Sequence, residues 1–264
     1  MKRVVSRQNP RLRDVERLIG SSRDRRKSGR CVLEGAHLIG VYCERFGAPD
    51  VLVVVDDQHD DDAIAASIAA TAPADVLVVS RALFSEIATM PPDVGALAVV
   101  AAPRTPADTT PGAFCLLLDG VQDPGNVGSI IRTAAAAGVD QVVMSPTCAF
   151  AWSPKALRAG QGAHFLTTLI EGVPLDGWCR TFGAQGGRVV ASVVDPHAIA
   201  VYDADLRGRL ALAIGSEGAG VSDAVLAQTD MRVTIPMAPG NESLNAGAAA
   251  AVLLFEAARQ RAPR

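Results

Sequence analysis

Aromatic residues and long apolar runs are scarce in this chain of 264 residues. Tryptophan, tyrosine and phenylalanine make up only 4% of the sequence although 49% of it is hydrophobic, so alanine and valine must fill most of the core. No run reaches the roughly 18 consecutive apolar residues expected of a membrane-spanning helix, and the first three residues lead into polar sequence instead of an apolar signal core. We therefore expect a globular protein in the cytoplasm.

Cysteine is too sparse and too scattered to form a disulfide framework or a zinc site. The cysteines are odd in number, none belongs to a CxxC pair, and none clusters with histidine. They are Cys31, Cys43, Cys115, Cys148 and Cys179. We expect reduced, mostly buried thiols and no bound metal.

The chain as a whole has no excess of positive charge, but its first 30 residues have one. The net charge is −3, whereas residues 1–30 hold eleven lysines and arginines against three acids, which gives +8 there and leaves −11 for the rest. A polyanion such as RNA can therefore be attracted to one end of the molecule, although a solvated basic helix would show the same composition. The candidate RNA contacts in this region are Arg7, Arg11, Arg25, Arg26, Lys27 and Arg30.

Strand and helix patterns alternate in both halves of the chain, which predicts two α/β domains. The first half has expected helices over residues 11–19, 37–46, 63–72 and 82–88 and expected strands over 30–33, 51–55, 76–79 and 97–101. Residues 103–112 contain three prolines and almost nothing apolar, which is typical of a linker. We expect one domain over residues 1–102 and a second over 113–264.

The second half is predicted to contain a mostly parallel sheet. Expected strands are 114–118, 142–144, 189–194, 210–214 and 233–235, and expected helices are 129–137, 153–160, 174–182, 222–228 and 245–261. In such sheets, ligands bind at the loops that follow the carboxyl ends of strands. The loops of this half are therefore the candidates for a binding site.

Three of these loops are rich in glycine and polar residues: 119–132, 214–220 and 235–245. Glycine lets backbone amides approach a ligand closely, and helix N-termini add a partial positive field. The first loop lacks the Lys-Ser/Thr ending of a P-loop, and the glycines of the second have the wrong order for a dinucleotide fingerprint. From these features alone the sequence predicts a nucleotide-like ligand in an α/β cleft.

Taken together and in this order, the three loops resemble the motifs of the SpoU (TrmH-like) branch of the SPOUT RNA methyltransferases. Asn126, Gly128 and Arg132 match the first motif, and residues 214–218 match the second. The third is matched by residues 235–237 and 242–245, and the likeness covers about residues 112–260. The basic N-terminal segment resembles the RNA substrate-binding domain of many members, which is built like a small ribosomal protein.

The resemblance implies an enzyme that transfers a methyl group from S-adenosylmethionine to a ribose 2'-hydroxyl of structured RNA. It also implies a deep trefoil knot, an obligate homodimer whose site draws on both subunits, and transfer without a metal. The separate N-terminal domain favours 23S ribosomal RNA over tRNA as substrate.

Residue roles follow from the same resemblance. Arg132 is the family's catalytic arginine, acting either as a base or as a cation that orients the ribose, and Asn126, Glu217, Ser243 and Asn245 are placed beside the transfer site. The cofactor pocket is expected to involve Gly215, Ser216, Gly218, Ile235, Met237, Leu244 and Asn245. Lys155 and Arg158 belong to a basic segment expected to lie next to the RNA, and two residues depart from the family pattern, Asn241 and Gly247.

Local sequence alone permits other interpretations. Asn126 would be an ordinary N-cap preceding its helix, and Glu217 a solvated loop acid. At the level of the whole protein, the alternatives are an RNA-binding dimer of the same fold without activity and an α/β enzyme acting on a small molecule. The second of these predicts no function for the N-terminal arginines.

Overall fold

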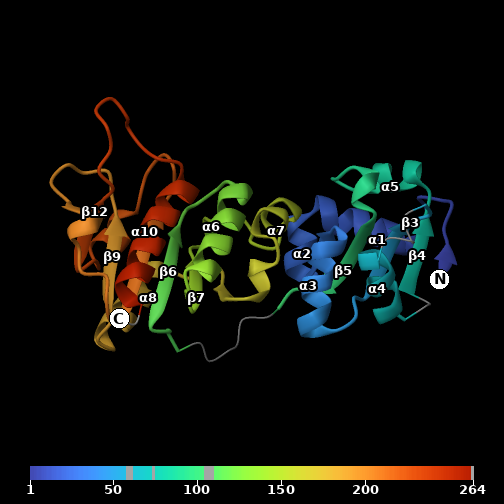
Figure 1. Ribbon diagram of the computed structural model, residues 1–264, viewed down its shortest axis with the longest axis horizontal. Helices are drawn as coiled ribbons and strands as arrows, with labels where there is room; N and C mark the ends of the chain where they lie inside the picture. Colours follow the sequence, from blue (N-terminus) through green and yellow to red (C-terminus); the bar gives the residue numbers. More distant parts are fainter. Residues whose placement is uncertain (58–61, 73–74, 104–109, 263–264) are drawn as a thin grey trace. The chain divides into compact units, whose positions relative to one another are not determined.

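The computed structural model describes residues 1–57, 62–72, 75–103 and 110–262 (Figure 1). Its contacts divide the chain into two compact units. The N-terminal unit is Met1–Arg104 together with Trp152–Phe165, and the C-terminal unit is Thr105–Ala151 together with Leu166–Arg264. The first division falls inside the predicted linker, of which residues 104–109 lie outside the described residues, whereas the inclusion of Trp152–Phe165 in the N-terminal unit was not predicted.

The N-terminal unit is built on a five-stranded sheet in the order β1-β4-β3-β5-β2. The strands are β1 (Lys2–Arg3), β2 (Arg30–Glu34), β3 (Val51–Val55), β4 (Val76–Val79) and β5 (Ala96–Ala101). The helices are α1 (Pro10–Gly20), α2 (Ser22–Ser28), α3 (Ala36–Phe46), α4 (Asp62–Ala70) and α5 (Arg81–Ile87), with a 3₁₀ turn over Pro92–Val94. β5 runs antiparallel to both of its neighbours, so this sheet is mixed.

One face of this sheet is covered by α1 and α5, whose apolar residues enter the same core as alternate residues of the strands. Leu12, Val15 and Leu18 of α1 are fully buried because their spacing puts them on one side of the helix. They pack in one cluster with strand residues such as Val53 and Leu77. The basic side chains of α1 are thereby left on its outer face.

The inserted segment Trp152–Phe165, hereafter the α7 segment, contains α7 (Pro154–Gly160) and a 3₁₀ turn over Ala163–Phe165. It packs against α3: Arg45 Nη1 donates to the Phe165 carbonyl at 2.7 Å, and the rings of Tyr42 and Phe165 meet edge to face at 5.4 Å between centroids. Gly162 has φ +88°, and a Cβ there would lie 2.9 Å from Val41. The segment therefore folds as part of the N-terminal unit although the preceding and following strands belong to the other one.

The C-terminal unit contains a seven-stranded sheet in the order β10-β12-β9-β11-β6-β7-β8, and every pairing in it is parallel. Its strands are β6 (Phe114–Asp119), β7 (Gln141–Met144), β8 (Thr168–Ile170), β9 (Arg188–Ser192), β10 (Ile199–Ala200), β11 (Leu210–Gly215) and β12 (Met231–Thr234). Its helices are α6 (Pro124–Ala136), α8 (Leu175–Ala184), α9 (Asp223–Leu226) and α10 (Ala246–Arg261), with a 3₁₀ turn over Val201–Asp203. The prediction of an α/β fold with a mostly parallel sheet is confirmed.

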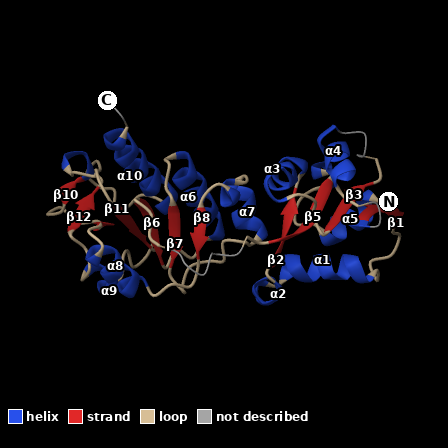
Figure 2. Ribbon diagram, turned by 90° about the horizontal axis from the view of Figure 1, so that it is seen from below, coloured by secondary structure: helices blue, strands red, loops and turns tan. Residues whose placement is uncertain are grey.

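Helices cover both faces of this sheet, α6 and α10 on one and α8 and α9 on the other (Figure 2). Strands buried on both faces need near-continuous apolar sequence, and Phe114 to Leu118 of β6 are all buried. Because β6 pairs in register with β11, Asp119 stands opposite Gly215 at the same edge. The first and second glycine-bearing loops therefore leave the sheet side by side.

Helix α6 begins at Pro124, five residues before the predicted start. Asp123 caps it by accepting from Asn126 N at 2.9 Å, and proline is favoured at the first helical position because its missing N–H has no partner there. Asn126 thus lies in the first turn, and the interpretation of Asn126 as a cap preceding the helix is wrong. Its side chain is consequently free to bond elsewhere.

The cysteines occur as free thiols, and burial raises the pKa of Cys31, Cys115 and Cys179 to about 12. Such thiols stay protonated near neutral pH and are poor nucleophiles. Among the described residues no group of three or more potential metal-ligating side chains occurs. No described helix combines the length and the apolar character that a membrane span requires.

Candidate functional site

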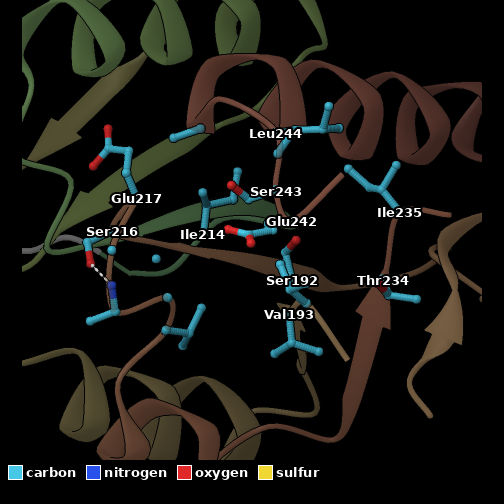
Figure 3. Close-up of a pocket in the computed structure, with 18 of the residues that line it drawn as sticks. Ser192, Val193, Ile214, Ser216, Glu217, Thr234, Ile235, Glu242, Ser243 and Leu244 are labelled. Carbon is cyan, nitrogen blue, oxygen red and sulfur yellow. Dashed lines mark hydrogen bonds between the residues drawn. The ribbon is translucent and has the colours of Figure 1, made fainter. Parts of the chain in front are cut away.

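A pocket of about 500 Å³ opens at the carboxyl edge of the C-terminal sheet (Figure 3). Its lining comes from the loops after β11 and β12 and from the end of β9. The predicted cofactor residues among its lining are Gly215, Ser216, Gly218, Ile235, Met237 and Leu244, and Glu217 and Ser243 line it too. Of the residues predicted to bind the cofactor, Asn245 does not line the pocket.

Sequence reasoning missed the contribution of β9. Ser192, Val193 and Val194 line the pocket because β9 lies between β11 and β12 in the sheet. Nothing in the local sequence marks this segment as part of a site, because strand order is decided by long-range packing. Thr234 and Glu242 also line the pocket and were not predicted to do so.

The loop after β11 makes a very tight turn. Ser216 N and O both bond to Gly220, at 3.1 and 3.0 Å, and Ala219 N donates to Ser216 Oγ at 3.1 Å, the dashed line in Figure 3. A Cβ on Gly215 would lie 1.9 Å from the Gly220 carbonyl carbon. Only glycine fits at this position, since real atoms do not approach so closely.

The loop after β12 offers backbone groups to the pocket. Within the described residues, no backbone hydrogen bond engages Glu242, Ser243 or Leu244. All three are exposed, and the Leu244 side chain lies at the pocket although 41% of the residue is accessible. Unpaired amides around a partly apolar cavity suit a ligand that combines an aromatic ring with polar ends.

A chain of side-chain amides links the three loops. Asn245 Oδ1 accepts from the backbone of Gly247 and Ala248 at 2.9 and 3.3 Å and so caps α10. Its Nδ2 must then point away, and it donates to Asn126 Oδ1 at 3.0 Å. Asn126 Nδ2 in turn donates to Glu217 Oε1 at 2.5 Å. This amide network (Asn126, Glu217, Asn245) fixes the orientation of both amides and joins the first, second and third motifs.

The variant Asn245→Asp separates the role of residue 245 as the N-cap of α10 from its role in the amide network. Aspartate is as good an N-cap as asparagine, so the free energy of unfolding should change by less than about 0.5 kcal/mol. The carboxylate cannot donate to Asn126, so the orientation of Asn126 and its bond to Glu217 should be lost, with a fall in turnover of about tenfold or more. Urea titration and an activity assay on the same preparation check this, and Asn245→Ala should impair both quantities.

Arg132 lies in α6 and is exposed. Within the described part of the chain it makes no hydrogen bond or ion pair, so its guanidinium is available to an external group. Gly247 lies close to the same helix, since a Cβ there would come within 2.9 Å of Ser129 Oγ and 3.1 Å of Asn245 Oδ1. A larger residue at 247 would have to displace the Ser129 hydroxyl, which gives the departure from the family pattern a local explanation.

The predicted RNA contacts of the N-terminal unit fall into different environments. Arg7, Arg11 and Arg30 form ion pairs with Glu16, Asp75 and Asp14, respectively. Arg26 and Lys27 are exposed on α2, Lys155 is exposed on α7, and Arg158 pairs with Glu34. Lys27 makes no ion pair within the described residues, so of the predicted RNA contacts it is the one whose charge is most accessible to a phosphate.

Arg25 is not a surface residue. It is 5% exposed, and its Nη1 donates to the carbonyls of Leu18 and Ile19 at 2.5 and 2.8 Å. These are carbonyls of the last turn of α1, which have no partner inside that helix. Arg25 therefore fixes the corner between α1 and α2, and the prediction that it contacts RNA is wrong.

Residues 113–255 match the SpoU rRNA Methylase family. The chain belongs to this family. It is 31% identical to the 23S rRNA (guanosine(2553)-2'-O)-methyltransferase RlmP of Bacillus subtilis, over 97% of this chain and 98% of that protein. It is 32% identical to the 23S rRNA (uridine(2479)-2'-O)-methyltransferase of Streptomyces viridochromogenes, over 98% of this chain and 93% of that one.

The fold of this SpoU family member is also similar to solved structures. The SpoU methyltransferase AviRb from Streptomyces viridochromogenes, in complex with the cofactor AdoMet, superposes with a TM-score of 0.84 at 28% identity. The match covers 96% of this chain and 98% of that structure. The likeness thus includes both units of the chain and extends well beyond the three motifs.

Proposed function

We propose that this chain transfers a methyl group from S-adenosylmethionine to a ribose 2'-hydroxyl of 23S ribosomal RNA. The observation that carries the proposal is the amide network, which joins the first motif loop to the second and third motif loops, and these two line one pocket. The named activities of the relatives in Bacillus and Streptomyces support the same reaction and the same class of RNA. A location in the cytoplasm, expected from the sequence, is part of this proposal.

The pocket fits S-adenosylmethionine. Its volume of about 500 Å³ lies within the range of small-molecule sites. Ile214, Ile235 and Leu244 would give a planar base an apolar surface, and Glu217 and Glu242, which line the same pocket, would supply negative charge to a donor that carries a positively charged sulfur. When bound, S-adenosylmethionine supplies an electrophilic methyl group to the reaction.

The chain's own residues must orient the ribose hydroxyl and ease the loss of its proton. A 2'-hydroxyl is a weak nucleophile near neutral pH, so accurate placement contributes much of the rate. Arginine stays protonated, which makes the Arg132 guanidinium better suited to donate hydrogen bonds to the ribose oxygen or an adjacent phosphate than to abstract a proton. Asn126 and Asn245 hold Glu217 in place at the pocket rim.

The proposal has two further parts. The active form is a homodimer, and the C-terminal domain of each copy is knotted. Phe255 is 52% exposed on α10, a helix that packs against α6, the helix of Arg132. Burying such a side chain against a second copy would stabilise a dimer. Light scattering coupled to size-exclusion chromatography should give twice the mass of the chain, and Phe255→Glu should shift the mass toward the monomer.

RNA binding through the exposed cations of α2 predicts a defined salt dependence. Each phosphate contact adds about one to the slope of log Kd against log salt, so Lys27→Gln should lower that slope by about one. Arg81→Gln is the matched control, because Arg81 is already paired with Asp57 and Asp93. Filter binding at several salt concentrations measures both slopes, and an unchanged slope for Lys27→Gln would remove this residue from the RNA interface.

The test of the proposed function compares classes of RNA. Purified protein, a donor labelled in its methyl group and unmodified 23S, 16S and transfer RNA should give incorporation into 23S RNA only. Incorporation into tRNA would support the tRNA alternative. Binding of RNA and donor without incorporation into any class would support an RNA-binding dimer that lacks activity.

A further inference from the structure

One wall of the pocket is held at its end by a carboxylate from another motif loop. Residues 216–221, which we call the wall loop, all line the pocket, and Ser216 and Glu217 are labelled at the left of Figure 3. Directly after the wall loop, Ser222 N donates to Asp119 Oδ2 at 2.8 Å. Asp119 is the last residue of β6 and lies 103 positions earlier in the sequence. A side chain of the first motif loop therefore fixes the point where the wall loop ends.

The wall loop returns to the point from which it leaves. It follows Gly215, which pairs with Asp119 in the sheet register, and the backbones of Ser216 and Gly220 are bonded to each other. Val221 is 6% exposed and belongs to an apolar cluster that includes residues of α8 and α9. Because both ends of the loop lie at the carboxyl end of β6, a single group there can hold the loop closed.

The surroundings of Asp119 make it a rigid anchor. Leu118 before it is fully buried, and Gly120 after it has φ +73° and donates from its N–H to Ser145 Oγ at 2.9 Å. A Cβ on Gly120 would lie 3.7 Å from Ser216 Cβ, so the first motif loop packs closely against the wall loop. A side chain presented from a fixed strand end can hold a loop accurately.

We propose that Asp119 is a positioning residue for the methyl donor. Through the Ser222 amide it keeps the wall loop closed, so that the loop meets the donor in one preformed shape. Asp119 is not among the described residues that line the pocket, so it acts on the donor through the loop and not by touching it. The inference deepens the proposed function and rests on it, because it takes the occupant of the pocket to be S-adenosylmethionine.

The competing explanation is electrostatic attraction between the Asp119 carboxylate and a positively charged donor. Replacement by asparagine separates the two ideas, since the amide oxygen can still accept from Ser222 N but carries no charge. Under the positioning proposal Asp119→Asn retains most of the donor affinity and Asp119→Ala does not. Under the electrostatic explanation both variants lose affinity equally.

The variant Ser222→Pro removes the same hydrogen bond from its donor side. Proline has no N–H, and the φ of −65° at Ser222 is the value that the proline ring imposes. The carbonyl of residue 222, which accepts from Leu226 N at 2.8 Å, is kept. Because Asp119→Ala and Ser222→Pro each remove the whole bond, the double variant should bind donor no more weakly than either single one.

The experiment measures donor affinity by calorimetry with S-adenosylmethionine alone, at a temperature where circular dichroism shows every variant to be folded. Asp119→Ala and Ser222→Pro should raise the Kd for the donor about tenfold or more, and Asp119→Asn should stay within about threefold of the unmodified protein. With donor and RNA both saturating, the turnover number of Asp119→Ala should also stay within about threefold, because the loss falls on donor binding.

The matched control is Asp140→Ala. Asp140 Oδ2 accepts from Phe114 N at 2.8 Å, so this variant removes the same kind of bond at the opposite end of the same strand. It should lose a comparable amount of stability but bind the donor within about twofold of the unmodified protein. Unchanged donor affinity in Asp119→Ala, an equal loss in Asp119→Asn, or an equal loss in Asp140→Ala would overturn the proposal.

Amide hydrogen exchange provides a measurement that does not depend on activity. In Asp119→Ala the amides of Ser216, Ala219 and Gly220 should exchange faster than in the unmodified protein, while those of β7 should not change. Unchanged exchange in the wall loop would also overturn the proposal. Weaker donor binding and faster exchange in a protein that methylates no RNA would support the role of Asp119 and contradict the proposed function, whereas an unmodified protein that binds no donor would contradict both.

Discussion

Arg132→Ala is expected to lower methyl transfer by about a thousandfold, the upper end of what removal of one preorganised donor costs. Donor binding should stay within about twofold of the original value, because Arg132 is not among the residues that line the pocket. Its guanidinium makes no hydrogen bond or ion pair within the described residues that the substitution would break, so the fold should also be unaffected. Calorimetry with donor and a single-turnover assay measure the two quantities.

The control for this prediction is Arg132→Lys. Lysine retains the charge but lacks the planar fork that can bond two oxygens at once, so it should recover only a small part of the lost rate. Full recovery would mean that charge alone matters. Equal loss of donor binding and transfer in Arg132→Ala would instead assign the residue a structural role.

Gly215→Ala is expected to weaken donor binding by at least about a hundredfold. The added carbon would lie 1.9 Å from the Gly220 carbonyl carbon and 2.1 Å from Val221 N, both backbone atoms that cannot rotate away. The loop after β11 would have to open, and the tight turn made by Ser216 and Gly220 would be lost. Such overpacking typically costs about 1–3 kcal/mol or more. Here the residues that must shift form the wall of the pocket.

The matched control is Gly183→Ala in α8 of the same unit. A Cβ at Gly183 meets nothing within 4 Å, and alanine is favoured over glycine inside a helix by about 1 kcal/mol. This variant should bind donor normally and be slightly more stable. Donor binding by Gly215→Ala that equals that of Gly183→Ala would show that the loop after β11 is not part of the donor site.

The three motif loops could be located from the sequence because a simple geometric rule determines the edge of the sheet at which they lie. Parallel strands place their carboxyl ends at one edge, so the loops after β6, β11 and β12 had to lie at the same edge if those strands shared a sheet. Glycine and amide side chains then marked which loops mattered. The direction of each hydrogen bond in the amide network was not predictable, because it depends on distances that only the folded chain fixes.

What the sequence did not reveal depends on long-range packing. The contribution of Ser192 to the pocket follows from the position of β9 between two strands that come later in the chain. The burial of Arg25 depends on the angle between α1 and α2, and α2 itself was not predicted because all seven of its residues are polar. The placement of the α7 segment in the N-terminal unit likewise has no local signal, since its partner Glu34 lies 124 positions away.

The most direct test of the central claim is the chemical position of the transferred methyl group. A methyl on the ribose 2'-oxygen blocks attack of that oxygen on the neighbouring phosphate, so alkaline hydrolysis cannot cut the chain there. After incubation of 23S RNA with the protein and labelled donor, alkali should leave the label in dinucleotides, and Arg132→Ala should give almost no label in the same incubation time. Label released in mononucleotides would show methylation of a base and would contradict the account.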